Sequence, residues 1–590
     1  MSEQYRVDPG SVSRSDGAVP SPAEPSAATD PRRRPGLSVL ERSLLGLLIA
    51  AAVVLRLVQV AEPLDRQFDG FQGAFFAVCA INYERLEGAH PAHTLLPRGA
   101  GDGYPVVNLD LDPAAPDTWY LYANHPPTVP WLAWSSLALF APDGWDQAWR
   151  EGLPPAGIEA PLRAPFMALN LLGLVALFLA LRAAGCRRAA WYATLFYAWT
   201  PAALLYAGLV NYENPTVPFV LAGVAAAVCY ARGGRAAWLA ATFAAFACAG
   251  AVTYAALFTA AALALLLPAC GWSRAARLTG AAVAGSLAPL ALHGARAGAL
   301  LEQHGESMGT LGSRVRTMVA PLLDGTTPLG TWLGVQAKLL TEEVGIALSL
   351  LAAGGLAIGV GRMLRRSHGD GTRDADLSAH LALALVVGGC AMQLAFYRHT
   401  RDPQDPFILH LVPGLAAAAG VLIARLSSGA TPAARWLVLT AALAVVVEGG
   451  LRSAQLHGRW RGAGPELGQS SAAAPLLPAP SRLGPALAEL LPAGDVAWYP
   501  GALGLGPATS FYAWRTLLPV TPGSYEATQL SQNDLGLEQA TTWLAIPTAV
   551  PPSAQAAVDE LLANLEAALP GSVREPSAAN AGWRLWRLRN

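Results

Sequence analysis

The feature of this chain that most constrains its fold is a series of apolar stretches, most of them long enough to cross a lipid bilayer. A helical crossing needs roughly 20 residues, and within lipid only helices and closed barrels satisfy every backbone polar group. Hydrophobic residues make up 53% of the chain and charged residues 14%, proportions that soluble globular proteins rarely show. The sequence therefore predicts an all-α polytopic membrane protein. The apolar stretches lie at about 43–61, 127–141, 165–181, 189–208, 215–231, 236–250, 252–269, 276–294, 342–361, 379–397, 406–424 and 435–451.

The arginines predict which side of the membrane each loop faces. Short loops rich in Arg stay in the cytoplasm, so the turns between them, at 211–215, 295–340 and 398–405, are expected on the outside together with the C-terminus. A cytoplasmic N-terminus and an outside C-terminus need an odd number of spans, whereas the apolar stretches number twelve. Either the short stretch 127–141 does not cross or one boundary is misplaced, and the prediction is eleven to thirteen spans. The arginine clusters lie at 182–188, 232–235, 274–277, 362–366 and 425–435.

The segments outside the spans differ in composition. Residues 1–36 are rich in Ser, Pro, Asp and Arg and have few large apolar side chains, which predicts a disordered cytoplasmic tail. The membrane domain then covers 37–451, and its first outside loop covers 62–126. A linker rich in Pro, Ala and Gly at 452–485 leads to 486–590, where a strand, a second strand, a helix and a third strand predict a small extracytoplasmic α/β domain.

Charge, cysteine spacing and the lack of repeats disfavour several function classes. The formal net charge is -1 and the arginines form no basic face, so no nucleic-acid partner is expected. The six cysteines lie mostly within or beside apolar segments and lack zinc-ligand or CxxC spacing, which predicts core residues instead of a metal site. The sequence has no internal repeat, which argues against the transporter folds built from duplicated halves.

The first outside loop opens with Phe68-Asp69-Gly70, directly after a span. A charge at the membrane edge is costly and is usually kept for a task. A carboxylate there can accept a proton from an attacking hydroxyl or amine, so Asp69 is the candidate general base. The alternative is that Asp69 caps the next helix, because residues 71–86 show the spacing of an amphipathic helix on the membrane surface.

Other polar residues lie beside turns or span ends. Asn124 and His125 precede a rigid Pro-Pro turn and could orient a phosphate or an acceptor; the alternative is that they simply end the loop. Glu213 lies in an Asn- and Pro-containing turn, where it could bind sugar hydroxyls or the acceptor, or be an ordinary turn residue. Glu342 and Glu343 precede a span and are assigned to an amphipathic helix that leads into it.

A loop near the end of the membrane domain carries Arg398, His399 and Arg401. Guanidinium groups give forked, charge-assisted hydrogen bonds to phosphate oxygens, which makes these residues candidates for binding phosphate. Arginines at span ends also extend to lipid headgroups, but an outside position runs against the usual charge bias. Asp110 and Asp112 have the spacing of a metal-binding Asp-x-Asp, yet carboxylates in such a loop are expected to be solvated. No metal site or cofactor is predicted, although a divalent cation could bind.

This order of features resembles the GT-C membrane glycosyltransferases, and within them the dolichyl-phosphate-mannose protein mannosyltransferases and the bacterial lipid A aminoarabinose transferases. The resemblance rests on a first span, a loop that begins with Asp69, a closing Tyr-x-Asn-His-Pro-Pro and a late Arg/His/Asp loop. It extends from about 40 to 450. The family's first loop carries an Asp-Glu pair, in which Asp69 matches the Asp while Gly70 replaces the Glu. His125 matches the residue that the family places before Pro-Pro.

The resemblance implies an inverting glycosyltransferase of the bacterial inner membrane, which moves a sugar from a polyprenyl-phosphate carrier to an extracytoplasmic lipid, glycan or protein. In that scheme Asp69 takes the acceptor's proton, while Arg398, Arg401 and His125 hold the carrier phosphate. Two alternatives remain open. A transporter or lipid flippase would also have many spans, but would place ionisable residues near the middle of helices. A non-catalytic scaffold of the same fold is compatible with the missing Glu at position 70.

Overall fold

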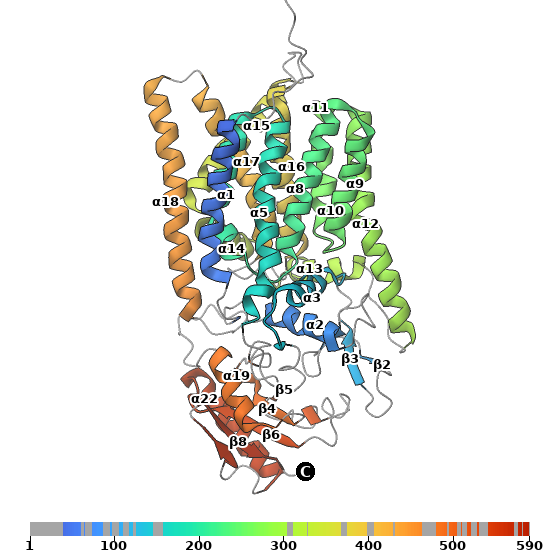
Figure 1. Ribbon diagram of the computed structural model, residues 1–590, viewed down its shortest axis with the longest axis vertical. Coiled ribbons are helices and arrows are strands. Elements are labelled where there is room, and N and C mark those ends of the chain that lie inside the picture. The colour runs from blue at the N-terminus through green and yellow to red at the C-terminus, as the bar shows by residue number, and fades with distance from the viewer. Residues whose placement is uncertain are drawn as a thin grey trace, which may run out of the picture. The chain divides into compact units, whose positions relative to one another are not determined.

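The chain is helical over most of its described length (Figure 1). The tail 1–36 and the Asp110 and Asp112 pair lie outside the described residues. The computed structural model describes residues 39–60, 64, 73–85, 95–96, 106–109, 117–121, 125–145, 157–303, 311–326, 328–366, 374–397, 406–428, 431–462, 480–492, 495–503, 509, 516–520, 528–529, 541–570, 576–580 and 582–588.

The helices follow the apolar stretches closely, and one of them, α9, has the same bounds as the predicted stretch 236–250. The described helices of the membrane domain are α1 (Val39–Val60), α2 (Ala74–Arg85), α3 (Thr128–Phe140), α5 (Glu159–Ala183), α6 (Arg187–Trp199), α7 (Pro201–Leu205), α8 (Glu213–Gly233), α9 (Ala236–Gly250), α10 (Ala256–Ala262), η2 (Leu263–Leu266), α11 (Leu267–Cys270), α12 (Trp272–Gln303), α13 (Leu311–Leu323), α14 (Leu329–Leu339), η3 (Leu340–Val344), α15 (Ile346–Arg366), α16 (Asp374–Ala395), η4 (Pro406–His410), α17 (Val412–Ser427) and α18 (Pro432–Gly462).

Several of these helices are long enough to cross a membrane. Among the described residues, α1, α5, α8, α12, α16 and α18 qualify by length and composition, and a seventh span results if α14–η3 and α15 count as one bent pair. Four shorter apolar helices accompany them, namely α3, α9, α17 and the pair α10–η2. The hydropathy count of eleven to thirteen spans included such shorter helices. The chain is a multi-pass membrane protein.

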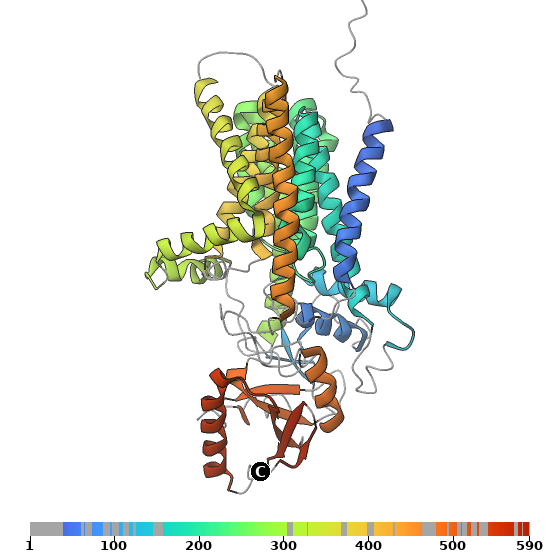
Figure 2. The ribbon, with the colours of Figure 1, turned by 90° about the vertical axis from the view of Figure 1, so that its left-hand side faces the viewer.

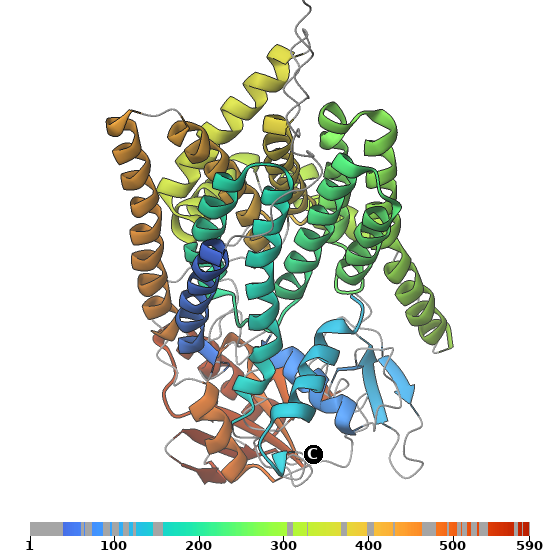
Figure 3. The same ribbon diagram turned by 45° about the horizontal axis from the view of Figure 1, so that its top comes forward.

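The spans pack closely through small residues. Helix α8 packs against α5 and α9, α9 packs against α12, and α17 packs against α6 and α15; α9, α10 and α12 form the green group in Figure 3. At the crossing of α9 and α12, a Cβ added to Gly250 or Gly285 would overlap the backbone of the other helix. Glycines at such crossings let helix backbones approach closely within a membrane.

Two predicted stretches are broken at single residues. The stretch 189–208 divides into α6 and α7 because Pro201 disfavours helical conformation at Thr200, whose ψ is 132°. A second break lies at Gly345, where φ is 99° and the chain turns by 111° between α14–η3 and α15. As a result α14, in yellow-green, lies across the direction of the spans (Figure 2).

Helix α2 is the helix predicted over 71–86, but its surroundings differ from the prediction. Its residues 74–81 and Tyr83 are all buried, and α2 packs against α3. The described part of α2 is therefore enclosed by protein instead of lying with one face on the membrane surface, because its apolar residues are nearly consecutive. An antiparallel sheet with strand order β1-β3-β2 contacts α2, and its strands are β1 (Leu95–Leu96), β2 (Val106–Leu109) and β3 (Asp117–Leu121).

The C-terminal segment forms a mixed sheet with the strand order β5-β4-β6-β8-β7. Strand β4 pairs in parallel with β5 and β6, and β8 pairs antiparallel with β6. The predicted α/β character is confirmed, and β5 is a strand that the sequence analysis missed. The elements are α19 (Pro480–Leu490), β4 (Val496–Pro500), η5 (Gly501–Leu503), β5 (Thr516–Val520), β6 (Thr542–Pro547), α22 (Pro552–Ala568), β7 (Ala578–Ala579) and β8 (Trp583–Arg587).

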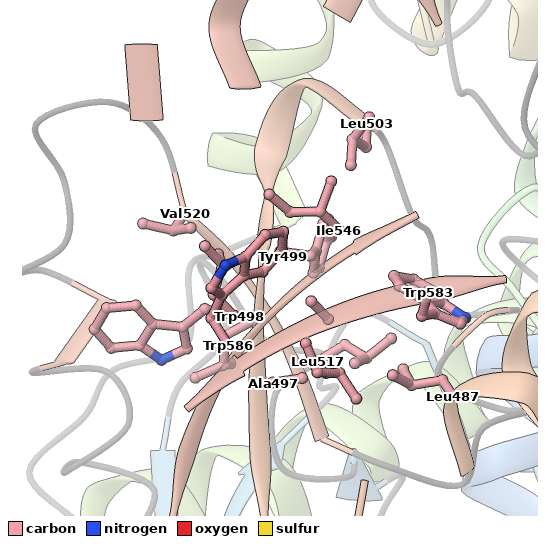
Figure 4. Close-up of a cluster of buried hydrophobic side chains, with 14 of the residues drawn as sticks. Leu487, Ala497, Trp498, Tyr499, Leu503, Leu517, Val520, Ile546, Trp583 and Trp586 are labelled. Carbon is pink, nitrogen blue, oxygen red and sulfur yellow. The ribbon is translucent and has the colours of Figure 1, made fainter. Parts of the chain in front are cut away.

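This sheet has a hydrophobic core of its own, made from residues between Leu483 and Leu588. Figure 4 shows Trp498, Ile546 and Trp583 among the side chains of that core. Helices occupy both ends of the predicted linker 452–485, since α18 continues to Gly462 and α19 begins at Pro480. A segment with its own core and strand pairing has the properties of a small domain.

Candidate functional site

Two of the predicted site residues, His125 and Glu213, lie within the described part of the chain. Asp69, Asn124, Arg398, His399 and Arg401 lie outside it. The structure therefore shows the surroundings of His125 and Glu213, together with the residues that flank the loop 398–405.

His125 lies between two tyrosine rings just before α3. Its ring centroid is 3.9 Å from that of Tyr212, with 25° between the ring planes, and 5.0 Å from that of Tyr254, with 9° between the planes. Two near-parallel rings this close to a third cannot share one of its faces without overlapping, so the tyrosines cover both faces of the imidazole. The plane of the ring is thereby fixed, and its polar contacts are made through the edge that carries the nitrogens.

The stack continues into the rings that flank the loop 398–405. Tyr254 stacks on Phe396 with 5.2 Å between centroids, and Phe396 stacks on Phe407 with 4.9 Å. Phe396 precedes the loop 398–405 and Phe407 follows it, so this loop starts and ends at one pair of stacked rings. The fold therefore brings both ends of the loop that carries Arg398 and Arg401 to the same row of rings as His125.

Glu213 directly follows Tyr212 and is the first residue of α8. The side chain of Glu213 is 2% exposed and that of Asn211 is 0% exposed. Within the part of the chain that the structure describes, neither Oε2 of Glu213 nor Nδ2 of Asn211 has a hydrogen-bond partner. Buried polar atoms are nearly always hydrogen-bonded, and each exception costs free energy. Hydroxyl groups of a ligand bound at this turn would supply the missing partners.

A second buried carboxylate, Glu343, lies in the π-helical turn η3. Its Oε1 accepts a hydrogen bond of 3.0 Å from the hydroxyl of Tyr206, which follows α7. The sequence predicts an amphipathic helix at Glu343 that leads into a span, and that prediction is wrong for its side chain, which lies inside the protein. Single π-helical turns occur frequently at functional sites. The available sequence signal was a carboxylate directly before an apolar stretch.

Several residues around the site were missed by the sequence analysis. Arg56 and Asn170 lie inside the predicted spans and are buried, and a polar residue within an apolar stretch is itself a signal of function. Tyr212 and Tyr254 carried no signal, because nothing in their local sequence shows that they stack on His125. Over the described ranges, no three His, Cys, Asp or Glu side chains are close enough to hold a metal ion together.

Comparison with known proteins gives matches of structure only. No family model and no curated protein sequence matches this chain. Its structure is similar to that of ArnT from Cupriavidus metallidurans bound to undecaprenyl phosphate, with a TM-score of 0.50 and 13% identity, over 92% of this chain and 98% of ArnT.

A second similar structure is the archaeal oligosaccharyltransferase AglB from Archaeoglobus fulgidus, solved with an inhibitory peptide and a dolichol-phosphate. The TM-score is 0.51 at 12% identity, over 86% of this chain and 70% of AglB. At such low identity these likenesses show the fold, and they confirm the GT-C-like fold that the sequence predicted.

Proposed function

We propose that this protein is an inverting glycosyltransferase that moves a sugar from a polyprenyl-phosphate carrier to an extracytoplasmic acceptor. The observation that carries the proposal is the stacked row of rings, in which His125, the turn of Glu213 and both ends of the loop 398–405 meet. The fold supports it, since ArnT has been solved with undecaprenyl phosphate and AglB with a dolichol-phosphate. Each of those ligands combines a long apolar chain with a phosphate.

In the proposed reaction, a hydroxyl or amine of the acceptor attacks the anomeric carbon on the face opposite the phosphate. Asp69 takes the proton of the attacking group, and the bond between the anomeric carbon and the phosphate oxygen breaks. The electron pair of that bond leaves with the polyprenyl phosphate, and the anomeric configuration is inverted. The departing phosphate needs cations more than it needs a proton, which is the role assigned to Arg398 and Arg401 with help from His399 and the edge of His125.

The turn at 211–215 is assigned to the sugar or the acceptor. The buried Oε2 of Glu213 can accept a hydrogen bond from a hydroxyl group, and Nδ2 of Asn211 can donate one. Leaving either atom without a partner costs about 1–3 kcal/mol, so a ligand that pairs both gains specificity as well as affinity. Asn124, next to His125, is assigned to the carrier phosphate or the acceptor.

The proposed location follows from the same assignment. The N-terminus faces the cytoplasm of a bacterial cell, and the loop of Asp69 and the C-terminal α/β domain face the outside of the inner membrane. The donor is a polyprenyl-phosphate-linked sugar, and the acceptor is a lipid, a glycan or a protein. The scheme requires no metal ion.

The test is transfer of labelled sugars from polyprenyl-phosphate carriers in membranes with wild-type protein or Asp69→Asn at matched expression. A general base contributes about 10²–10⁴-fold to a rate, and we expect a loss of that size. Asp324→Asn is the matched control, because Asp324 is exposed and its carboxylate accepts hydrogen bonds from the nearby Thr326. Full transfer by Asp69→Asn would exclude Asp69 as the base, and no transfer by the wild type from any carrier would contradict the proposed function.

A further inference from the structure

A buried arginine in the first span starts a chain of hydrogen bonds through the membrane domain. Arg56 is 0% exposed. Its Nε donates to Oδ1 of Asn170 at 3.0 Å, while its two terminal nitrogens donate to the backbone oxygens of Ala52 and Ala203 at 3.1 and 3.2 Å. These bonds tie α1 to α5 and to the short helix α7. Such an arginine is costly in a membrane unless its donors are satisfied.

The series of hydrogen bonds continues from Asn170 into the turn that carries Glu213. Nδ2 of Asn170 donates to Oδ1 of Asn214 at 3.3 Å. Nδ2 of Asn214 then donates to the backbone oxygens of Tyr206 and, at 2.8 Å, of Leu209. The backbone N–H of Asn214 in turn donates to Oδ1 of Asn211 at 3.2 Å. Hydrogen bonds therefore hold both the side chain and the backbone of Asn214, the residue that follows Glu213.

The direction of these bonds follows from the groups at both ends. Arginine can only donate, so Asn170 presents its oxygen to Arg56 and its NH₂ group to Asn214. Backbone carbonyls can only accept, so Asn214 presents its NH₂ group to Tyr206 and Leu209. Each asparagine has one orientation that satisfies both neighbours. This series of hydrogen bonds is consequently a specific arrangement. Substitution of Arg56 or Asn170 removes the partner that orients the next residue in the series.

We propose that Arg56 and Asn170 are positioning residues for Glu213. They hold Asn214, and Asn214 fixes the first turn of α8, so the carboxylate of Glu213 keeps its place at the start of that helix and the ring of Tyr212 keeps its place on His125. The inference rests on the proposed function, in which the turn at 211–215 binds the sugar or the acceptor. Displacement of a binding group by 1 Å can cost a reaction about 10²-fold, which is why a residue that touches no ligand can matter.

The first experiment measures the turn without reference to activity. Purified full-length protein is treated with a water-soluble carbodiimide and a labelled amine, and modification of Glu213 is followed by mass spectrometry. In the wild type the buried carboxylate should react slowly. Asn170→Leu and Arg56→Met should each raise the rate at Glu213 by about tenfold, the change expected when a buried hydrogen bond to a charged or turn-fixing group is lost.

The matched control is Thr242→Val. Thr242 is fully buried, and its hydroxyl donates to the backbone oxygen of Trp238 within its own helix, so the change removes a part-buried hydrogen bond that is not connected to Arg56. It should leave modification of Glu213 at the wild-type rate. Unchanged modification in Asn170→Leu and Arg56→Met, at melting temperatures equal to that of Thr242→Val, would overturn the proposal.

Arg56→Lys provides a second variant in case Arg56→Met does not fold. Lysine keeps the positive charge and much of the length, but its ammonium group lacks the planar fork that reaches Asn170, Ala52 and Ala203 together. It should fold and still raise modification of Glu213 above the wild-type rate. A wild-type rate in Arg56→Lys would mean that the charge alone is needed, and would contradict the positioning role.

The second experiment uses transfer from the polyprenyl-phosphate sugar that the wild type accepts. Asn170→Leu should lower the rate about as much as Glu213→Gln does, by about 10²-fold, and the double variant should lose little more than either single variant. Losses that multiply in the double variant would contradict action through Glu213. If the wild type transfers no sugar at all, the proposed function fails, while the modification of Glu213 still decides whether Arg56 and Asn170 fix the turn.

Discussion

At the scale of single residues, the candidate site depends on side chains whose partners come from distant parts of the sequence. Tyr212 and Tyr254 cover the two faces of His125. A stacked aromatic pair contributes about 0.5–1.5 kcal/mol beyond the area it buries, and it also fixes the plane of the ring. The ring of His125 therefore packs between the tyrosines, while the proposed contact with the carrier phosphate is assigned to its nitrogens.

His125→Phe keeps a flat ring between the tyrosines and removes both nitrogens. We expect an unchanged melting temperature for the purified protein and a Kd for undecaprenyl phosphate that rises about tenfold, the equivalent of one hydrogen bond to a charged group. His125→Ala removes the ring as well and should also lower the melting temperature. Thermal unfolding and direct binding of undecaprenyl phosphate check both variants. Equal affinity in the wild type and His125→Phe would show that the nitrogens do not contact the phosphate.

There is a physical reason why the sequence indicates some residues of the candidate site and not others. His125 and Glu213 could be chosen as candidates because a polar residue beside a Pro-Pro turn or a span end is visible within a few positions of sequence. Tyr254 could not, because an aromatic residue near a span end is ordinary until the fold places it on His125. Asn170 and Asn214 become partners only when α5 packs against α8, and local spacing does not state which helices pack together.

At the scale of elements, hydropathy predicted where the helices lie but not where they break. The stretch 236–250 matches α9, since apolar content reports the burial of a whole segment in lipid or protein. Breaks depend on single residues, as at Pro201 and Gly345. The bend at Gly345 is fixed by Glu448 of α18, whose carboxylate accepts hydrogen bonds from the first two N–H groups of α15 at 2.9 and 2.8 Å.

Gly345→Ala tests this bend. At a φ of 99° a side chain is strained, and a Cβ would lie 3.3 Å from Oε2 of Glu448. We expect a loss of about 1–3 kcal/mol in the free energy of unfolding, the cost of holding a residue with a side chain in a backbone conformation that glycine alone adopts readily. The measurement is the midpoint of thermal unfolding in detergent.

Gly361→Ala is the matched control for that variant. Gly361 lies in α15, the helix that begins directly after Gly345, and an added Cβ would meet nothing within 4 Å. Alanine favours a helix over glycine by about 0.5–1 kcal/mol, so this variant should unfold at an unchanged or higher temperature. A similar fall in both variants would show that the conformation of Gly345 is not what sets the stability of the bend.

At the scale of the whole molecule, the chain combines a membrane domain with a C-terminal domain that has a separate core. The C-terminal core consists of residues between Leu483 and Leu588 and includes none from the spans. Within it Trp583 is 0% exposed, and its ring N–H donates to the backbone oxygen of Leu483 at 2.6 Å. Because cooperative unfolding follows shared cores, the C-terminal domain should be able to unfold while the spans stay folded.

Trp583→Ala tests that separation. Truncation of a buried tryptophan costs about 3–5 kcal/mol, a large part of the stability of a small domain. In the full-length protein in detergent, limited proteolysis should then degrade the residues after Leu483 quickly, while the fragment of the membrane domain survives as in the wild type. Trp436→Ala removes a tryptophan that is 69% exposed on α18, and both fragments should stay resistant. Loss of both fragments in Trp583→Ala would show that the membrane domain needs the C-terminal core to stay folded.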